Sequence, residues 1–147
     1  MKLKQSGTIA PANEPWTLIR DAIHDLELQE KQEGVEIDMT AWHDQRDGSC
    51  QQCLAGSVMS RRLGTDTDDK KFPDSFPRDV EARLYALEYF RLGEVDEAYE
   101  YLGLEHPASL TARIPIPGYH RGPSAFKAAM RKLADRLEAA QSKPTKP

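Results

Sequence analysis

The chain has 147 residues, of which 39% are hydrophobic and 30% charged, and its formal net charge is −4. This composition is typical of one folded, soluble domain, and it excludes collagen-like and wholly disordered chains. No segment approaches the roughly 18 apolar residues of a membrane span, and the N-terminal residues lack the apolar run of a secretory signal, so we expect a cytoplasmic protein without membrane contact.

Apolar residues recur at helical spacing along most of the chain. From Trp16 to Leu26 they follow steps of three and four residues, with Asn13 as the expected N-cap and Gly34 as the expected stop. Near the C-terminus similar steps relate Phe126, Met130, Leu133 and Leu137. We therefore predict an all-α fold of about five helices, over residues 15–32, 49–63, 77–92, 94–103 and 123–141.

Three segments between these helices are predicted to be irregular loops. In residues 35–48, Val35, Ile37 and Met39 alternate with polar residues as in a strand. A lone strand has nothing to pair with, so we predict a loop there. The polar residues 64–76 and the proline-rich residues 104–122 are the other two loops.

The length argues for a single compact domain rather than two. We expect residues 1–12 to form an extended N-terminal segment and residues 13–141 to form the helical domain. The last six residues, SKPTKP at 142–147, are expected to be a disordered tail.

The charge is unevenly distributed. Residues 1–112 carry 12 Lys and Arg against 22 Asp and Glu, whereas residues 113–147 carry eight against two. Such asymmetry marks either a contact for nucleic acid or a basic helix that docks on the acidic body of its own chain. Solvated charged faces are the usual case for surface helices, so we favour the second interpretation.

His43, Cys50 and Cys53 form the most suggestive cluster of potential metal ligands. Thiolates three residues apart on the first turn of a helix can share one ion, and a nearby imidazole can supply a third ligand for zinc. Two small buried side chains that begin an apolar stripe give the same spacing. We favour that structural role, with a structural zinc as the alternative.

Sequence motifs of catalysis are missing from the chain. It has no Walker motif, no G-x-G-x-x-G and no G-x-S-x-G. The aspartates from Asp66 to Asp74 lack the glycine and glutamate of a calcium-binding loop, because those positions hold Lys71 and Pro77. We therefore expect a protein that is not an enzyme and needs no cofactor.

Arg113, Tyr119, His120 and Arg121 are the candidate binding residues. They lie on a segment stiffened by Pro115 and Pro117, which loses less entropy on binding than a flexible loop. The segment leads into a helix N-terminus, which attracts anions. A phosphate or carboxylate group is the ligand this pattern favours.

One stretch resembles a known class of proteins. The segment from Trp42 and His43 through Cys50-Gln51-Gln52-Cys53-Leu54-Ala55-Gly56-Ser57-Val58-Met59, with the opening SGTIAPANEPW, is similar to small uncharacterised proteins encoded by tailed bacteriophages and prophages. The resemblance implies a bacterial host cytoplasm as the setting. It implies no chemistry and no functional residues.

Our leading hypothesis is a non-catalytic phage or prophage accessory protein that binds a host or phage protein. The first alternative is a nucleic-acid-binding protein that uses the basic residues 113–147, although no known reading motif is present. The second is a small domain stabilised by structural zinc. Self-association through the apolar stripe of residues 123–141 is a further hypothesis.

Overall fold

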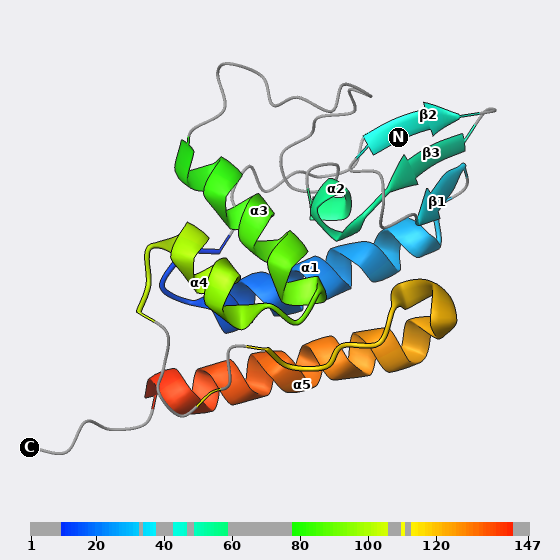
Figure 1. Cartoon of the computed structure of the whole chain (residues 1–147). Helices are drawn as coiled ribbons and strands as arrows, with labels where there is room; N and C mark the ends of the chain where they lie inside the picture. The colour runs from blue at the N-terminus through cyan, green and yellow to red at the C-terminus, as the bar shows by residue number, and fades with distance from the viewer. Residues whose placement is uncertain are drawn as a thin grey trace, which may run out of the picture.

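The computed structural model describes residues 10–32, 34–37, 43–46, 49–58, 78–105, 110 and 113–142. In chain order its elements are α1 (Pro15–Glu30), β1 (Val35–Ile37), β2 (His43–Arg46), β3 (Ser49–Gln52), α2 (Leu54–Val58), α3 (Arg78–Arg91), α4 (Val95–Leu102), the 3-10 turn η2 (Tyr119–Arg121) and α5 (Pro123–Ser142) (Figure 1).

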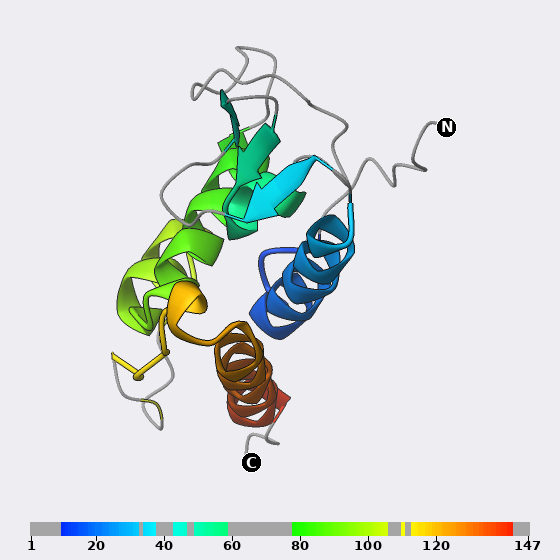
Figure 2. The same cartoon turned by 90° about the vertical axis from the view of Figure 1, so that its right-hand side faces the viewer.

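Helices α1 and α5 lie side by side and antiparallel, as both ribbon views show (Figures 1 and 2). Their apolar residues recur every three or four positions, so each helix presents one continuous apolar stripe. The stripe of α5 is buried within the chain, at Phe126, Met130, Leu133, Ala134 and Leu137. The self-association hypothesis requires this stripe to be exposed. Because it is buried, it is not available to a second copy of the chain.

Ion pairs along one flank of α1 and α5 hold the two helices in register. Glu30 accepts a hydrogen bond from Lys127 at 2.8 Å, and Glu27 accepts one from Arg131 at 2.8 Å. Toward the other end the polarity reverses, because Arg20 of α1 pairs with the carboxylates of α5 at 2.7 and 2.8 Å. The basic last helix thus docks on carboxylates of its own chain.

Helices α3 and α4 form a hairpin that contributes the other side of the core. Leu84, Leu87 and Phe90 of α3 are fully buried, as are Val95 and Ala98 of α4. The ring of Phe90 meets the ring of Tyr99 edge-on at 6.2 Å. Burial raises the pKa of the Tyr99 phenol to about 12.

Gly93, in the turn between α3 and α4, fastens this hairpin to the segment that precedes α5. Its φ is +78°, in the left-handed region that favours glycine. Its carbonyl accepts a hydrogen bond from the Ile114 amide at 2.8 Å, and Glu94 and Arg113 form a β-bridge beside it. A Cβ on Gly93 would lie 1.9 Å from the Ile114 carbonyl oxygen. The backbones can therefore meet this closely only at a glycine.

The predominantly helical character expected from the sequence is confirmed, but the loop predicted at residues 35–48 is wrong. Strands β1 and β2 lie in that segment and join β3 in a small sheet of order β1-β3-β2. β1 pairs with β3 in parallel, and β2 pairs with it in antiparallel fashion. The lone strand at Val35–Ile37 therefore has a partner, supplied by residues that we assigned to a helix.

The predicted helix at 49–63 begins later than expected, at Leu54, because Ser49–Gln52 is β3. Cys50 thus lies on a strand, while Cys53, Leu54, Ser57 and Val58 are buried. Asn13 is not the N-cap, since Glu14 directly precedes α1. Of the other predicted loops, 104–122 contains a β-bridge and the turn η2, and 64–76 lies outside the described residues.

The substitution Gly93→Ala is expected to lower the free energy of unfolding by about 3 kcal/mol or more. The left-handed backbone costs roughly 1–2 kcal/mol and the displacement of Ile114 roughly 1–3 kcal/mol. Gly103→Ala is the matched control, because Gly103 has a φ of +71° with no atom within 4 Å of a Cβ. Denaturant unfolding followed by circular dichroism compares the two, and equal losses would contradict the tight contact at Ile114.

The substitution Glu27→Gln is expected to destabilise the protein by about 0.5–1 kcal/mol near neutral pH and to have no effect at strongly acidic pH. Burial acts to raise the pKa of Glu27, but the hydrogen bond from Arg131 and the charges of Arg131 and Lys127 outweigh it and lower that pKa. The ionised Glu27 side chain therefore contributes its full stabilisation above its ordinary pKa of 4.5. This stabilisation is lost as the pH falls through the lowered pKa of Glu27 in the folded protein. Unfolding free energies measured across this range test the sign, with the exposed Glu105→Gln as control.

Candidate binding groove

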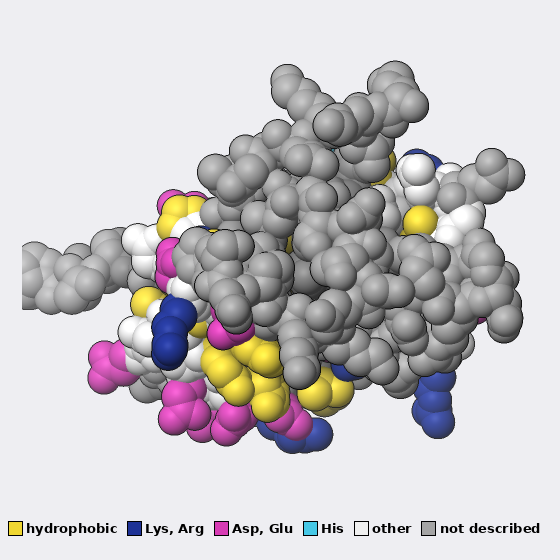
Figure 3. Space-filling model, turned by 90° about the horizontal axis from the view of Figure 1, so that it is seen from above, with side chains coloured by type: hydrophobic (Ala, Val, Ile, Leu, Met, Phe, Trp, Pro, Cys, Tyr) yellow, Lys and Arg dark blue, Asp and Glu magenta, His cyan; other side chains and the backbone are white. Residues whose placement is uncertain are grey.

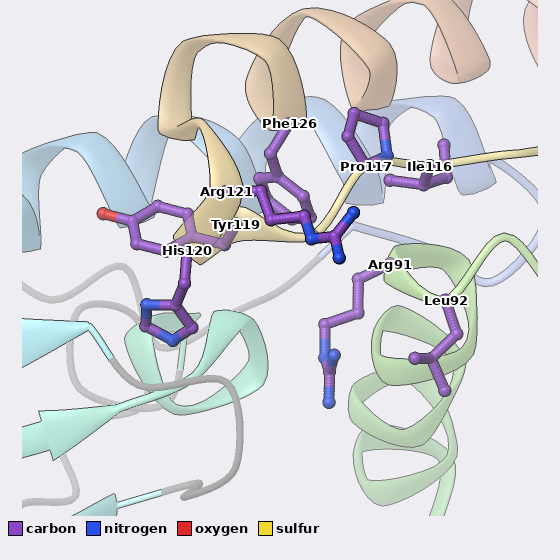
Figure 4. Close-up of a pocket in the computed structure, with 9 residues that line it drawn as sticks. Arg91, Leu92, Ile116, Pro117, Tyr119, His120, Arg121 and Phe126 are labelled. Atoms are coloured by element: carbon purple, nitrogen blue, oxygen red, sulfur yellow. The ribbon is translucent and has the colours of Figure 1, made fainter.

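A surface hollow of about 520 Å³ lies between the C-terminal end of α3 and the turn η2. We call it the α3–η2 groove. Figure 4 shows Arg91 and Leu92 on the α3 side and His120 and Arg121 on the η2 side. Its apolar wall consists of Leu92, Ile116, Pro117 and Phe126.

Tyr119 anchors η2 to the body of the protein. Its hydroxyl donates a hydrogen bond to Glu30 Oε2 at 2.5 Å, and the other oxygen of Glu30 accepts the hydrogen bond from Lys127. The Tyr119 ring also meets Phe126 edge-on at 5.7 Å. Burial, together with the hydrogen bond and the charge of Glu30, raises the pKa of the Tyr119 phenol. Tyr119 therefore positions the turn.

Three cationic or protonatable side chains surround the groove. His120 and Arg121 are exposed on η2, and the His120 ring lies edge-on to Tyr119 at 5.3 Å. Arg91 comes from α3, where its Nε donates to Glu88 Oε1 at 3.0 Å. Because the charge of Arg91 is already paired with Glu88, His120 and Arg121 are the groove side chains that an anion would meet first. The N-terminus of α5 follows η2 directly and adds a weaker attraction.

The structure brings together three of the four binding residues predicted from the sequence. Tyr119, His120 and Arg121 all line the groove. Arg113 does not, because its guanidinium pairs with Glu94 at 3.0 Å beside the α3–α4 turn. The sequence reasoning missed Arg91 and Leu92, which lie at the end of α3 and in the turn after it, almost thirty residues earlier in the chain.

The candidate zinc ligands differ from expectation in their backbone setting. Cys50 lies on β3 opposite Gln45, His43 lies on β2 opposite Gln52, and Cys53 is fully buried just before α2. The two cysteines therefore do not share the first turn of a helix. Among the described residues no group of three or more His, Cys, Asp or Glu side chains is arranged to hold a metal ion.

A comparison with protein-family models, curated proteins and solved structures finds no match to this chain. Among the helices that the structure describes, none combines the length and the apolar character that a membrane crossing requires. The groove must therefore be interpreted from its own chemistry. It offers positively charged hydrogen-bond donors next to an apolar wall, which suits a carboxylate beside an apolar side chain.

The substitution Tyr119→Phe is expected to cost about 1–2 kcal/mol of unfolding free energy, since Glu30 loses a partly buried hydrogen bond. It is also expected to loosen η2, so that the amides of Arg121 and Gly122, bonded to Gly118 and Tyr119, exchange faster with solvent. Hydrogen exchange measured by NMR tests this, with the Ala98 amide of α4 as the internal control. Unchanged exchange at both η2 amides would show that Tyr119 does not hold the turn.

Proposed function

We propose that this chain is a non-catalytic binding protein whose α3–η2 groove holds an acidic segment of a partner protein. The observation that carries the proposal is the placement of His120 and Arg121 at one hollow with an apolar wall, opposite Arg91, whose guanidinium is paired with Glu88. The resemblance to phage and prophage proteins adds that the partner is a host or phage protein in the bacterial cytoplasm.

Ion pairing within the chain favours a protein partner over a nucleic acid. Of the basic side chains in residues 113–147, Arg113 pairs with Glu94, and Lys127 and Arg131 pair with carboxylates of α1. These three charges are not available to a row of phosphates, on which affinity for nucleic acid depends. The groove concentrates its positive charge at one place and adds Leu92, which is 45% exposed.

The zinc alternative rests on weaker support than the spacing suggested. Cys53 is fully buried beside Leu54 at the start of α2, as a core residue would be. A zinc site would have to combine it with Cys50 and His43 from two neighbouring strands. Elemental analysis of protein purified without chelator decides this alternative directly.

The groove is tested with a fluorescein-labelled, blocked ten-residue peptide that contains four glutamates and two leucines. Fluorescence anisotropy is expected to show binding that Arg121→Gln weakens about five- to tenfold, since a charge-assisted contact is lost. Lys132→Gln is the matched control, because it removes the same charge from an exposed site of α5 outside the groove.

Three outcomes would contradict the proposed site. The first is no binding of the glutamate peptide at low salt. The second is an equal loss of affinity in Arg121→Gln and Lys132→Gln, which would indicate non-specific attraction. The third is tighter binding of a duplex DNA of 20 base pairs with a steep salt dependence, which would favour the nucleic-acid alternative.

A further inference from the structure

Three tyrosines stack on the outer side of the α3–α4 hairpin. The Tyr101 ring of α4 lies 5.4 Å from the Tyr85 ring and 5.3 Å from the Tyr89 ring, with interplanar angles of 22° and 20°. Tyr85 and Tyr101 are 37% and 41% exposed. The buried residues of both helices lie elsewhere, at Leu84, Ala86, Leu87 and Phe90 of α3 and Val95, Ala98, Tyr99 and Leu102 of α4. The stack thus presents aromatic surface to solvent.

Carboxylates surround this aromatic stack. Glu97 and Glu100 of α4 line a hollow of about 360 Å³ together with Tyr101. Burial raises the pKa of the Tyr85 phenol, and the charge of Glu81 and the neighbouring Tyr101 add to this effect. Figure 3 shows hydrophobic side chains gathered over the α3–α4 end of the molecule, with acidic side chains and some basic ones around them. We call Tyr85, Tyr89, Tyr101, Glu97 and Glu100 the tyrosine face.

The chemistry of the tyrosine face is opposite to that of the α3–η2 groove. Aromatic rings carry negative charge on their faces and attract cations, and tyrosine is enriched among the residues that dominate binding energy at protein interfaces. Carboxylates beside the rings complement the same positive charge. Arginine fits such a surface better than lysine, because its planar guanidinium stacks on a ring and bonds a carboxylate through two donors.

We propose that the tyrosine face binds an arginine-containing basic segment of a partner protein, with a guanidinium stacked on Tyr101 and paired with Glu97 or Glu100. This surface is separate from the groove, which takes an acidic segment. Its occupant follows from charge complementarity with the carboxylates and from the stacked rings. The inference is independent of the proposed role of the groove, and each can fail alone.

The test uses NMR of protein with ring-labelled tyrosines, since the chain has only five of them. The probe is a blocked twelve-residue peptide with four arginines in a glycine and serine background, at near-physiological salt. The signals of Tyr85, Tyr89 and Tyr101 are expected to shift saturably, while that of Tyr99, which is 1% exposed, stays unchanged. The analogue with four lysines is expected to bind several-fold more weakly.

Two variants separate the parts of the surface. The double substitution Glu97→Gln and Glu100→Gln is expected to weaken binding of the arginine peptide about tenfold, and Tyr101→Leu about fivefold, because leucine keeps apolar bulk but lacks the ring. Asp96→Asn, an exposed charge on the same helix outside the hollow, is the matched control. Arg121→Gln is expected to leave this binding unchanged, which distinguishes the tyrosine face from the groove.

The proposal would be overturned by any of three results. Tyrosine signals that do not move at millimolar arginine peptide exclude the site. An equal loss of affinity for the arginine peptide in Asp96→Asn would show that the binding is only general electrostatic attraction. Shifts of Tyr85 and Tyr101 that depend on protein concentration alone, without peptide, would show that a second copy of the chain occupies the surface.

Discussion

The backbone contact between Gly93 and Ile114 is the constraint on which the placement of both candidate surfaces depends. It joins the α3–α4 turn to the chain that leads into η2 and α5, through a 2.8 Å hydrogen bond and an approach that leaves no room for a Cβ. Because Arg91 and Leu92 directly precede this glycine, the contact sets the distance between the two walls of the groove. Tyr89 of the tyrosine face lies one helical turn before Gly93, and the turn at Gly93 places Tyr101 of α4 against Tyr85 and Tyr89 of α3.

The antiparallel pairing of α1 and α5 provides the other fixed element. Apolar burial supplies its stability, because each buried large side chain contributes roughly 1.5–3 kcal/mol, whereas partly exposed ion pairs contribute less than about 1 kcal/mol each. The ion pairs instead determine register, since their polarity reverses along the seam from Glu30 and Lys127 to Arg20 and Asp135. Glu30 connects this seam to the groove, because its second oxygen accepts the Tyr119 hydroxyl.

Local periodicity was enough to predict the long helices, but it failed where partners are distant in sequence. The stripe from Phe126 to Leu137 is buried as its spacing predicts. Ser49–Gln52 is too short to reveal its period, and its pairing with Val35–Ile37 on one side and His43–Arg46 on the other makes it a strand. The residues of the α3–η2 groove also fall into two groups, those that local sequence predicts and those that it does not. Tyr119, His120 and Arg121 could be found because they are neighbours along a proline-stiffened segment, whereas no local signal relates Arg91 to them. Likewise, Tyr85 and Tyr89 are visible as an i, i+4 pair, but Tyr101 joins them only through the hairpin.

Internal ion pairing sharpens the contrast between the two surfaces. Two cations near the α3–α4 turn are compensated, because Arg91 pairs with Glu88 and Arg113 pairs with Glu94. The carboxylates of α1 nearest the groove are compensated as well, by Lys127 and Arg131. A charge without an ion-pair partner acts over roughly 8–10 Å at physiological salt, which is about the thickness of one helix. Unpaired side chains of opposite charge within that distance would cancel much of the electrostatic potential of the groove or of the tyrosine face. The two proposed sites therefore differ in the side chains they offer: His120 and Arg121 at the groove, and Glu97 and Glu100 beside the stacked tyrosines.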